Sequence, residues 1–351
     1  MAYPISATEL PANTTTPGKS LHGGVPGFRL INGQLGQVKK LIGEQLVAPA
    51  KTEDINRLLE YVNARSGKML RPGLVLLAGA SCGKITGEHI RVAAVIEMIH
   101  NATLLHDDVI DEGKTRRGLP TINSIWGNES SVLLGDFILG RVFKMCAELD
   151  PWIGRTIAAT AVRVCEGELR QIAQRQNWQL SESQYLDIIT EKSAALFSCC
   201  CSLGGLLARA SEREVRSLAE FGLNAGIAFQ ITDDLLDIIG DENKTGKTLG
   251  SDVDKSKLTL AMIHFLKMAQ EKEKAEVKNT LNGSTSSPSR AKSRDKDTMV
   301  EILHRYGSLE YTRKRAREFT ARAVKALATL EKSDAKDALI ETAKFMADRT
   351  A

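Results

Sequence analysis

Apolar side chains recur at spacings of three and four residues along most of the chain. A representative stripe contains Leu218, Phe221, Ala225 and Phe229. This spacing places the apolar side chains on one face of an α-helix, and that face packs against neighbouring helices. The sequence contains no alternating apolar and polar pattern of comparable length, which would indicate β-strands. It therefore predicts an all-α fold.

The helical pattern also predicts where the folded domain begins. Residues 1–30 contain four prolines, the run Thr14-Thr15-Thr16 and almost no apolar periodicity, which predicts a disordered leader. A transit peptide is the alternative, because the segment is rich in Ser and Thr, although Arg29 is its only arginine. The pattern becomes helical from about Leu35, and we expect one helical domain over residues 31–351.

One long interruption lies within this domain, at residues 282–298. It is rich in Gly, Ser, Thr and Pro, and then in lysine and arginine. We predict a surface loop between two helices, with a patch for a binding partner as the alternative. Because helical periodicity continues on both sides, the interruption does not indicate a domain boundary.

Composition supports this organisation and excludes several classes of protein. The 351 residues are 42% hydrophobic but only 5% aromatic, which disfavours a β-sandwich or barrel. The formal net charge of +4 gives no indication of nucleic-acid binding. No apolar run reaches the roughly 20 residues of a transmembrane helix, and no signal peptide is evident. The six cysteines lack metal-site spacing and are expected to be reduced thiols in a cytoplasmic protein.

The most informative segment is HNATLLHDDVIDEGKTRRG, which starts at His100. Asp107 and Asp111 are four residues apart and share a helix face, with Asp108 beside them and His100 on nearly the same stripe. Clustered carboxylates repel one another unless cations neutralise them. Oxygen ligands of this kind favour Mg²⁺, which usually also binds phosphate oxygens of a substrate. Alone, the cluster is equally consistent with a polar helix end.

A second acidic cluster, QITDDLLD, changes that balance. Asp233 and Asp237 are again four residues apart, with Asp234 between them and Gln230 on the same face. Apolar helical sequence surrounds both clusters, where unpaired carboxylates would be costly. Two metal-binding faces around a shared cavity account for both clusters.

Basic residues that match phosphate accompany the two clusters. They follow the first cluster, precede Pro72, lie on a separate helix, or flank a Gly-rich loop after the second cluster: Lys68, Arg71, Arg116, Arg117, Lys192, Lys247 and Lys257. Each alone is more simply a surface charge. Their joint placement predicts a site for a phosphorylated ligand.

The order of these motifs resembles the trans-isoprenyl diphosphate synthases, which join isopentenyl diphosphate to an allylic diphosphate. The resemblance runs from about Leu35 to the C-terminal helices and weakens after Asn282. It is carried by GK-x-x-RP at 67–72, the Asp-rich motif and RRG at 107–118, Gly135-Asp136, GE-x-x-Q at 167–171, and FQ-x-x-DD-x-x-D at 229–237. It implies a single helical bundle around a central cavity, a homodimer, and about three Mg²⁺ ions per active site.

The resemblance also implies roles for individual residues. The metal ions would be held by Asp107, Asp108, Asp111, Asp233, Asp234 and Asp237, which form the catalytic set together with Lys192 and Gln230. The allylic diphosphate would contact Arg116, Lys192, Lys247 and Lys257, and the isopentenyl diphosphate site would contain Lys68, Arg71, His100 and Arg117. Gln230 matches a glutamine that lines the reacting end.

Two residues depart from the family pattern. Ser193 follows Lys192 where the family usually has threonine. It retains a hydroxyl, and the resemblance implies that this hydroxyl would replace that of the threonine in substrate binding. Ala261 occupies a position where proline is common, which leaves the start of that helix uncertain. Neither change removes a charged ligand.

In this family, the product length depends on bulk beneath the first Asp-rich motif. Ala102 lies about 7.5 Å below Asp107 along the helix, and Thr103 is its neighbour. Large aromatic residues here stop growth early in the family, and neither residue is aromatic. We therefore expect a long product, as made by octaprenyl or solanesyl diphosphate synthases.

Two other functions remain open. A class I terpene cyclase shares the helices and one Asp-rich motif, but the complete DDLLD motif at 233–237 disfavours it. A non-catalytic regulatory subunit would tend to lose the Asp-rich motifs, and both are intact here.

Overall fold

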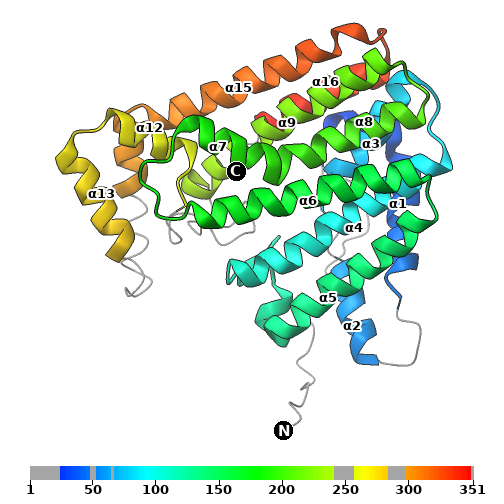
Figure 1. Ribbon diagram of the computed structural model, residues 1–351, viewed down its shortest axis with the longest axis horizontal. Helices are drawn as coiled ribbons and strands as arrows, with labels where there is room; N and C mark the ends of the chain where they lie inside the picture. Colours follow the sequence, from blue (N-terminus) through cyan, green and yellow to red (C-terminus); the bar gives the residue numbers. More distant parts are fainter. Residues whose placement is uncertain (1–23, 48–52, 65–66, 241–256, 284–297, 349–351) are drawn as a thin grey trace.

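The computed structural model describes residues 24–47, 53–64, 67–240, 257–283 and 298–348, and it is helical almost throughout (Figure 1). The elements of the N-terminal half are η1 (Pro26–Ile31), α1 (Asn32–Gln45), α2 (Glu53–Asn63), α3 (Leu70–Cys82), α4 (Gly87–Ile110), β1 (Thr115–Arg116), β2 (Leu119–Pro120), α5 (Ile122–Ala147) and α6 (Pro151–Ala173). Those of the C-terminal half are α7 (Glu182–Ile189), η2 (Thr190–Ala194), α8 (Ala195–Leu207), α9 (Glu212–Ile239), α12 (Leu260–Met268), α13 (Glu271–Gly283), α15 (Ser308–Ala326), η4 (Leu327–Thr329) and α16 (Asp334–Ala347).

The helices pack as neighbours around α3, α4, α8 and α9. Helix α4 packs against α3 and α5, α8 packs against α3 and α9, and α15 lies along α9 (Figure 1). The strands β1 and β2 form a two-stranded antiparallel hairpin directly after α4, in which Arg116 pairs with Leu119. The all-α prediction is therefore confirmed, and the Asp-rich segments belong to α4 and α9, two of the longest helices described.

Two apolar cores hold these helices in place. The larger one contains fully buried residues of α3 and α4, including Leu76 and Ile96, and extends to α5, α8 and α16. The smaller one joins α7, α9, α12 and α15 around Ile231 and Phe265. Burying a side chain of this size contributes about 1.5–3 kcal/mol. The cores thus fix the C-terminal ends of α4 and α9, where the two acidic clusters lie.

The N-terminal boundary differs from the sequence prediction in one respect. Val25 and Phe28 are only 4% and 2% exposed, and Pro26–Ile31 form a short 3-10 helix that packs against α16. The last residues of the predicted leader are therefore part of the helical core, because two apolar side chains suffice to anchor a short segment. Residues 1–23 lie outside the described residues.

Two further expectations concern the C-terminal half. Most of the predicted loop, residues 284–297, lies outside the described residues, whereas Asn282 and Gly283 still belong to α13. Helix α12 begins at Leu260 after the N-cap Thr259, so Ala261 does not displace its start. In the part of the chain that the structure describes, no helix is long and apolar enough to cross a membrane.

Candidate active site

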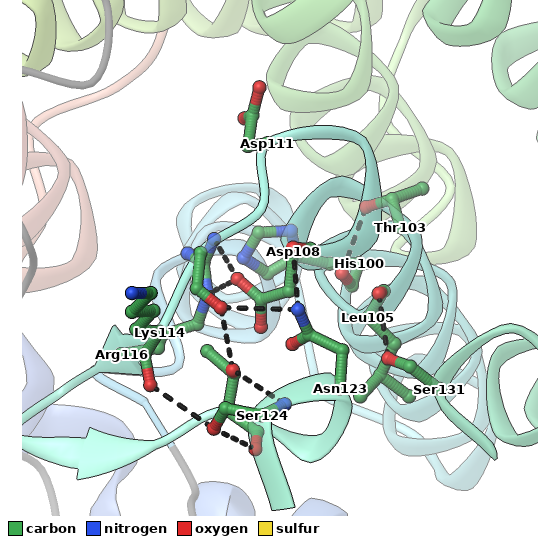
Figure 2. A network of polar contacts seen from close by, with 12 residues as sticks. His100, Thr103, Leu105, Asp108, Asp111, Lys114, Arg116, Asn123, Ser124 and Ser131 are labelled. Carbon is green, nitrogen blue, oxygen red and sulfur yellow. Dashed lines mark hydrogen bonds and ion pairs between the residues drawn. The ribbon is translucent and has the colours of Figure 1, made fainter. Parts of the chain in front are cut away.

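The first Asp-rich motif lies at the C-terminal end of α4, and its second aspartate is held by the protein. Asp108 is 4% exposed, and its Oδ1 accepts hydrogen bonds from Nε and Nη2 of Arg116, both at 2.7 Å. Asn123 on α5 donates to the backbone carbonyl of Asp108 at 3.1 Å (Figure 2). The β-hairpin therefore serves to return Arg116 to the end of α4.

Asp111 ends the helix and lies apart from this pair (Figure 2). Its Oδ1 is 3.6 Å from Nζ of Lys257 and 3.8 Å from Nη2 of Arg175. Lys257 is nearly buried and comes from the segment between the second motif and α12. The structure therefore brings a basic residue that follows the second acidic cluster to the first cluster. Arg175 was not predicted from the sequence.

Asp107 lies in an environment that disfavours its negative charge. The pKa of its carboxyl is raised to about 6. Burial is the largest cause, the nearby carboxylates of Glu168 and Asp111 add to it, and Lys192 and Arg116 act in the opposite direction. Residues from α4, α6 and η2 thus face the same region. A carboxylate whose charge is opposed by burial and by other carboxylates is a natural ligand for a divalent cation.

Lys192 occupies the π-helical turn η2 and is fixed by two residues of α6. Its Nζ lies 2.6 Å from Oε2 of Glu168 and donates to Oε1 of Gln171, also at 2.6 Å. A Cβ at Gly167 would lie 2.3 Å from the backbone nitrogen of Lys192, so only glycine allows α6 to approach this closely. The GE-x-x-Q segment of α6 therefore holds the side chain of Lys192 in place.

The second Asp-rich motif repeats the arrangement on α9. Asp234 is 8% exposed, and both of its oxygens accept hydrogen bonds, from Nε2 of Gln230 at 2.7 Å and from the hydroxyl of Tyr185 at 2.6 Å. Ser193 donates to Oε1 of Gln230 at 2.5 Å. Asp233 and Asp237 are partly exposed. In both motifs the second aspartate thus accepts hydrogen bonds from protein donors.

Tyr185 was not predicted from the sequence, and it gives the first prediction. Replacing Tyr185 by phenylalanine removes a buried hydrogen bond to a carboxylate, so we expect the free energy of unfolding to fall by about 1–3 kcal/mol. Urea denaturation followed by circular dichroism measures this change. Tyr311→Phe is the matched control, because its hydroxyl donates to Glu182 at 2.6 Å in a more exposed place and its loss should matter less. Equal losses in the two variants would contradict the prediction.

A separate cluster of basic residues lies between α3 and the hairpin. The guanidinium of Arg71 is 4.7 Å from the centre of the Phe197 ring, and Nζ of Lys68 is 5.2 Å from that of Phe345. Burial lowers the pKa of Arg71, while Glu97 and, more weakly, Cys200 and Asp233 of the second motif raise it. Arg117 adopts a left-handed backbone conformation, with φ of 55°, and His100 is half-buried.

The remaining residues of the predicted site are readily located. Ala102 is fully buried on α4, and Thr103 is half-buried with its hydroxyl donating to the His100 carbonyl at 2.9 Å. Lys247 lies outside the described residues. The structure therefore brings predicted residues of α4, η2 and α9 together, and it places Arg116 of the hairpin and Lys257 beside them.

The fold and this site define a class of protein: an all-α protein with two acidic helix faces and a set of cations suited to a phosphorylated ligand. The family description "Polyprenyl synthetase" matches residues 52–298, and the chain belongs to that family.

Curated relatives agree over most of the chain. The octaprenyl diphosphate synthase of Escherichia coli is 35% identical over 296 residues, which are 84% of this chain and 90% of the relative. A short chain isoprenyl diphosphate synthase of Methanothermobacter thermautotrophicus is 32% identical over 302 residues, which are 85% of this chain and 91% of the relative. The relatives thus include both long-chain and short-chain enzymes.

Solved structures show the same fold. A polyprenyl synthase from Caulobacter crescentus, crystallised with calcium and isoprenyl diphosphate, matches with a TM-score of 0.87 and 32% identity over 95% of this chain and all of that chain. A decaprenyl diphosphate synthase from Rhodobacter capsulatus matches with a TM-score of 0.82 and 35% identity over 92% of this chain and 98% of that chain.

Proposed function

We propose that this protein is a trans-prenyltransferase that condenses isopentenyl diphosphate with an allylic diphosphate, head to tail. The observation that carries the proposal is the junction between the two acidic faces. Lys257, which follows the second motif, approaches Asp111 of the first motif. The charge of Lys192 lowers the pKa of Asp107 in the first motif, and the neighbouring Ser193 donates a hydrogen bond to Gln230 beside the second motif. A diphosphate with metal ions fits between two carboxylate faces bridged by cations.

The donor set suits magnesium. Asp107, Asp111, Asp233 and Asp237 supply hard oxygen ligands, with Asp108 and Asp234 behind them. Among the described residues, no three His, Cys, Asp or Glu side chains are grouped closely enough to hold an ion by themselves. Mg²⁺ is usually bound through one or two carboxylates together with phosphate oxygens, so aspartate oxygens beside a diphosphate suit it. When bound, about three such ions would neutralise the charge that develops on the diphosphate.

The residues of this chain bind and orient the two substrates. The allylic diphosphate lies against Lys192, Lys257 and Arg116, whose positive charges stabilise the leaving group as the C–O bond breaks and the electron pair departs with the diphosphate. The allylic cation is attacked by the double bond of isopentenyl diphosphate. The proton lost from that substrate passes to the departed diphosphate, and the apolar helices keep water from the cation.

Product analysis tests this function. Purified protein incubated with farnesyl diphosphate, isopentenyl diphosphate and Mg²⁺ should release longer prenyl diphosphates, and a chelator should abolish turnover. Activity that persists in the chelator would contradict the mechanism. Products formed from the allylic substrate alone would indicate a terpene cyclase, and turnover only after addition of a second protein would indicate a regulatory subunit.

We further propose a long product, supported by the small side chains of Ala102 and Thr103. Thr103→Phe places an aromatic ring on a half-buried position of α4, so we expect the variant to stop at about twenty carbons or fewer. Chromatography of the dephosphorylated products measures the length. Thr103→Val is the control, since it removes the hydroxyl and adds no bulk. Wild-type products that already end at this length would overturn the assignment.

The proposal includes a homodimer. Four large apolar side chains on α5 and α6 are more than half exposed: Leu133, Phe143, Val162 and Leu169. Exposed apolar residues on helices that touch each other are typical of a protein interface, and α5 and α6 are in contact. Sedimentation equilibrium tests the oligomeric state.

The proposal also places the enzyme in the cytoplasm. All six cysteines are free thiols, and Cys199, Cys200 and Cys201 are buried in the core. Burial raises the pKa of these thiols, most strongly for Cys200 and Cys201, which keeps them unreactive. Free thiols fit a reducing compartment.

A further inference from the structure

The π-helical turn η2 lies between α6 and α9 and contacts both helices. Its Lys192 is bound by side chains of α6, and the next residue, Ser193, donates to Gln230 of α9. Helix α9 comes so close to the turn that a Cβ at Gly226 would lie 2.7 Å from Cα of Ala194. Because Lys192 and Ser193 are adjacent, the placement of this one turn sets the position of both side chains.

A third residue of η2, which none of the motifs includes, forms a two-pronged ion pair with α6. Glu191 directly precedes Lys192, and its two carboxylate oxygens accept hydrogen bonds from Nε and Nη2 of Arg163, at 2.7 and 3.2 Å. This bond to Glu191 raises the pKa of the Arg163 guanidinium. Paired bonds of this kind fix the orientation of a carboxylate as well as its distance.

Arg163 lies on the face of α6 that contacts η2. Arg163, Gly167 and Gln171 are spaced by four residues, so they share one stripe of the helix. Gly167 lets the two backbones approach closely, and Gln171 accepts a hydrogen bond from Nζ of Lys192. Together with the bond from Arg163 to Glu191, this stripe holds η2 at its backbone and at two consecutive side chains.

The geometry of the Arg163–Glu191 pair matters more than its contribution to stability. The side chain of Arg163 is 48% exposed and that of Glu191 is 23% exposed, and ion pairs open to solvent add little to the stability of a fold. A two-pronged pair nevertheless restricts the segment that carries it. Single π-helical turns are rare and occur frequently at functional sites, where the placement of one side chain is decisive.

We propose that Arg163 and Glu191 are positioning residues that fix η2, so that Lys192 meets the diphosphate of the allylic substrate in the orientation needed for ionisation. The inference rests on the proposed function. The two residues do not touch the substrate and act through Lys192.

The test compares Arg163→Gln with Glu191→Gln, each of which breaks the ion pair. Both variants should lower kcat about five- to tenfold and leave the KM for each substrate within about twofold of wild type. A direct effect of charge on the diphosphate would give opposite changes, because one variant removes a positive charge and the other a negative charge. An unchanged kcat in either variant, or changes in opposite directions, would overturn the proposal.

A control variant and a double-mutant cycle show whether the pair acts through Lys192. Arg216→Gln breaks a 3.1 Å pair with Glu212 at the N-terminal end of α9 and should leave kcat unchanged. In a Lys192→Gln background, Arg163→Gln should lower kcat by a smaller factor than in wild type. Equal factors in the two backgrounds would mean that Arg163 acts independently of Lys192, which contradicts the proposal.

Hydrogen exchange separates this inference from the proposed function, because it needs neither substrate nor turnover. Mass spectrometry of the metal-free protein should show the amides of residues 190–194 exchanging at least about fivefold faster in Arg163→Gln than in wild type, with no change in Arg216→Gln. Equal exchange in Arg163→Gln and wild type would overturn the positioning role. A wild type without turnover would overturn the proposed function, and faster exchange in the variant would still support the fixed placement of η2.

Discussion

Replacing Asp107 by asparagine is expected to lower kcat/KM by about a thousandfold or more, while leaving the metal-free protein at least as stable as wild type. The loss of activity follows because asparagine cannot supply the negative charge that the proposed magnesium site requires. A thousandfold corresponds to about 4 kcal/mol of transition-state stabilisation, a reasonable share for one ligand of a metal-assisted ionisation.

The stability effect follows from the direction of the pKa shift. The pKa of Asp107 is about 6 in the folded protein, against 3.8 for an ordinary aspartate. The folded state therefore binds more protons than the unfolded state between these values, so the free energy of unfolding falls as the pH rises from about 4 to about 6. Above pH 6 the destabilisation is complete, and asparagine removes it.

Thermal unfolding in a chelator at pH 5 and pH 8 measures this effect, alongside steady-state kinetics with Mg²⁺. The advantage of Asp107→Asn over wild type should be larger at pH 8. Glu341→Gln, at an exposed carboxylate in the middle of α16, is the control and should change neither the melting temperature nor the kinetics. A variant that keeps its activity, or that melts below wild type at pH 8, would contradict the assignment.

The second large effect is expected from Lys192→Gln, which should lower kcat by about 10²–10³-fold. Glu168 and Gln171 on α6 hold Lys192, so its ammonium group is fixed before any substrate binds. Its positive charge also lowers the pKa of Asp107. A preorganised cation stabilises the charge that develops on the leaving diphosphate more than it stabilises the bound substrate. Removing it also leaves Glu168 uncompensated beside the acidic cluster, which opposes the approach of an anion.

Steady-state kinetics at saturating Mg²⁺ measure the effect, and the fall in kcat should exceed the change in KM for the allylic substrate. Lys274→Gln on α13 is the matched control, since Lys274 forms a 2.7 Å pair with Glu271 and is equally exposed. If Lys192→Gln changed only the KM, the lysine would contribute to binding and not to ionisation of the allylic substrate.

The periodic pattern predicted the helices reliably, because an amphipathic helix repeats its apolar positions within one segment. It also predicted that Asp107 and Asp111 share a face, since residues four apart lie one turn from each other. The π-helical turn at Thr190–Ala194 left no comparable signal, because it differs from an α-helix only in its hydrogen-bond register. The buried Phe28 was missed because the apolar residues around it form a segment too short to show a helical period.

Two site residues were missed because their contacts join segments that are distant in sequence. Tyr185 reaches Asp234 from a different helix, and Arg175 reaches Asp111 from beyond the end of α6. Neither contact leaves a trace in local spacing. Glu97, a buried charged residue within the apolar run from Val92 to Ile99, did leave a local signal.

The sequence by itself determined the all-α class, the two acidic helix faces and the types of cation that accompany them, because these depend on residues close together along the chain. Only the tertiary structure decided which donors hold Asp108 and Asp234, and which lysine approaches which carboxylate. Those relations depend on the packing of helices distant in sequence, since burial and charge pairing arise only when separate elements meet.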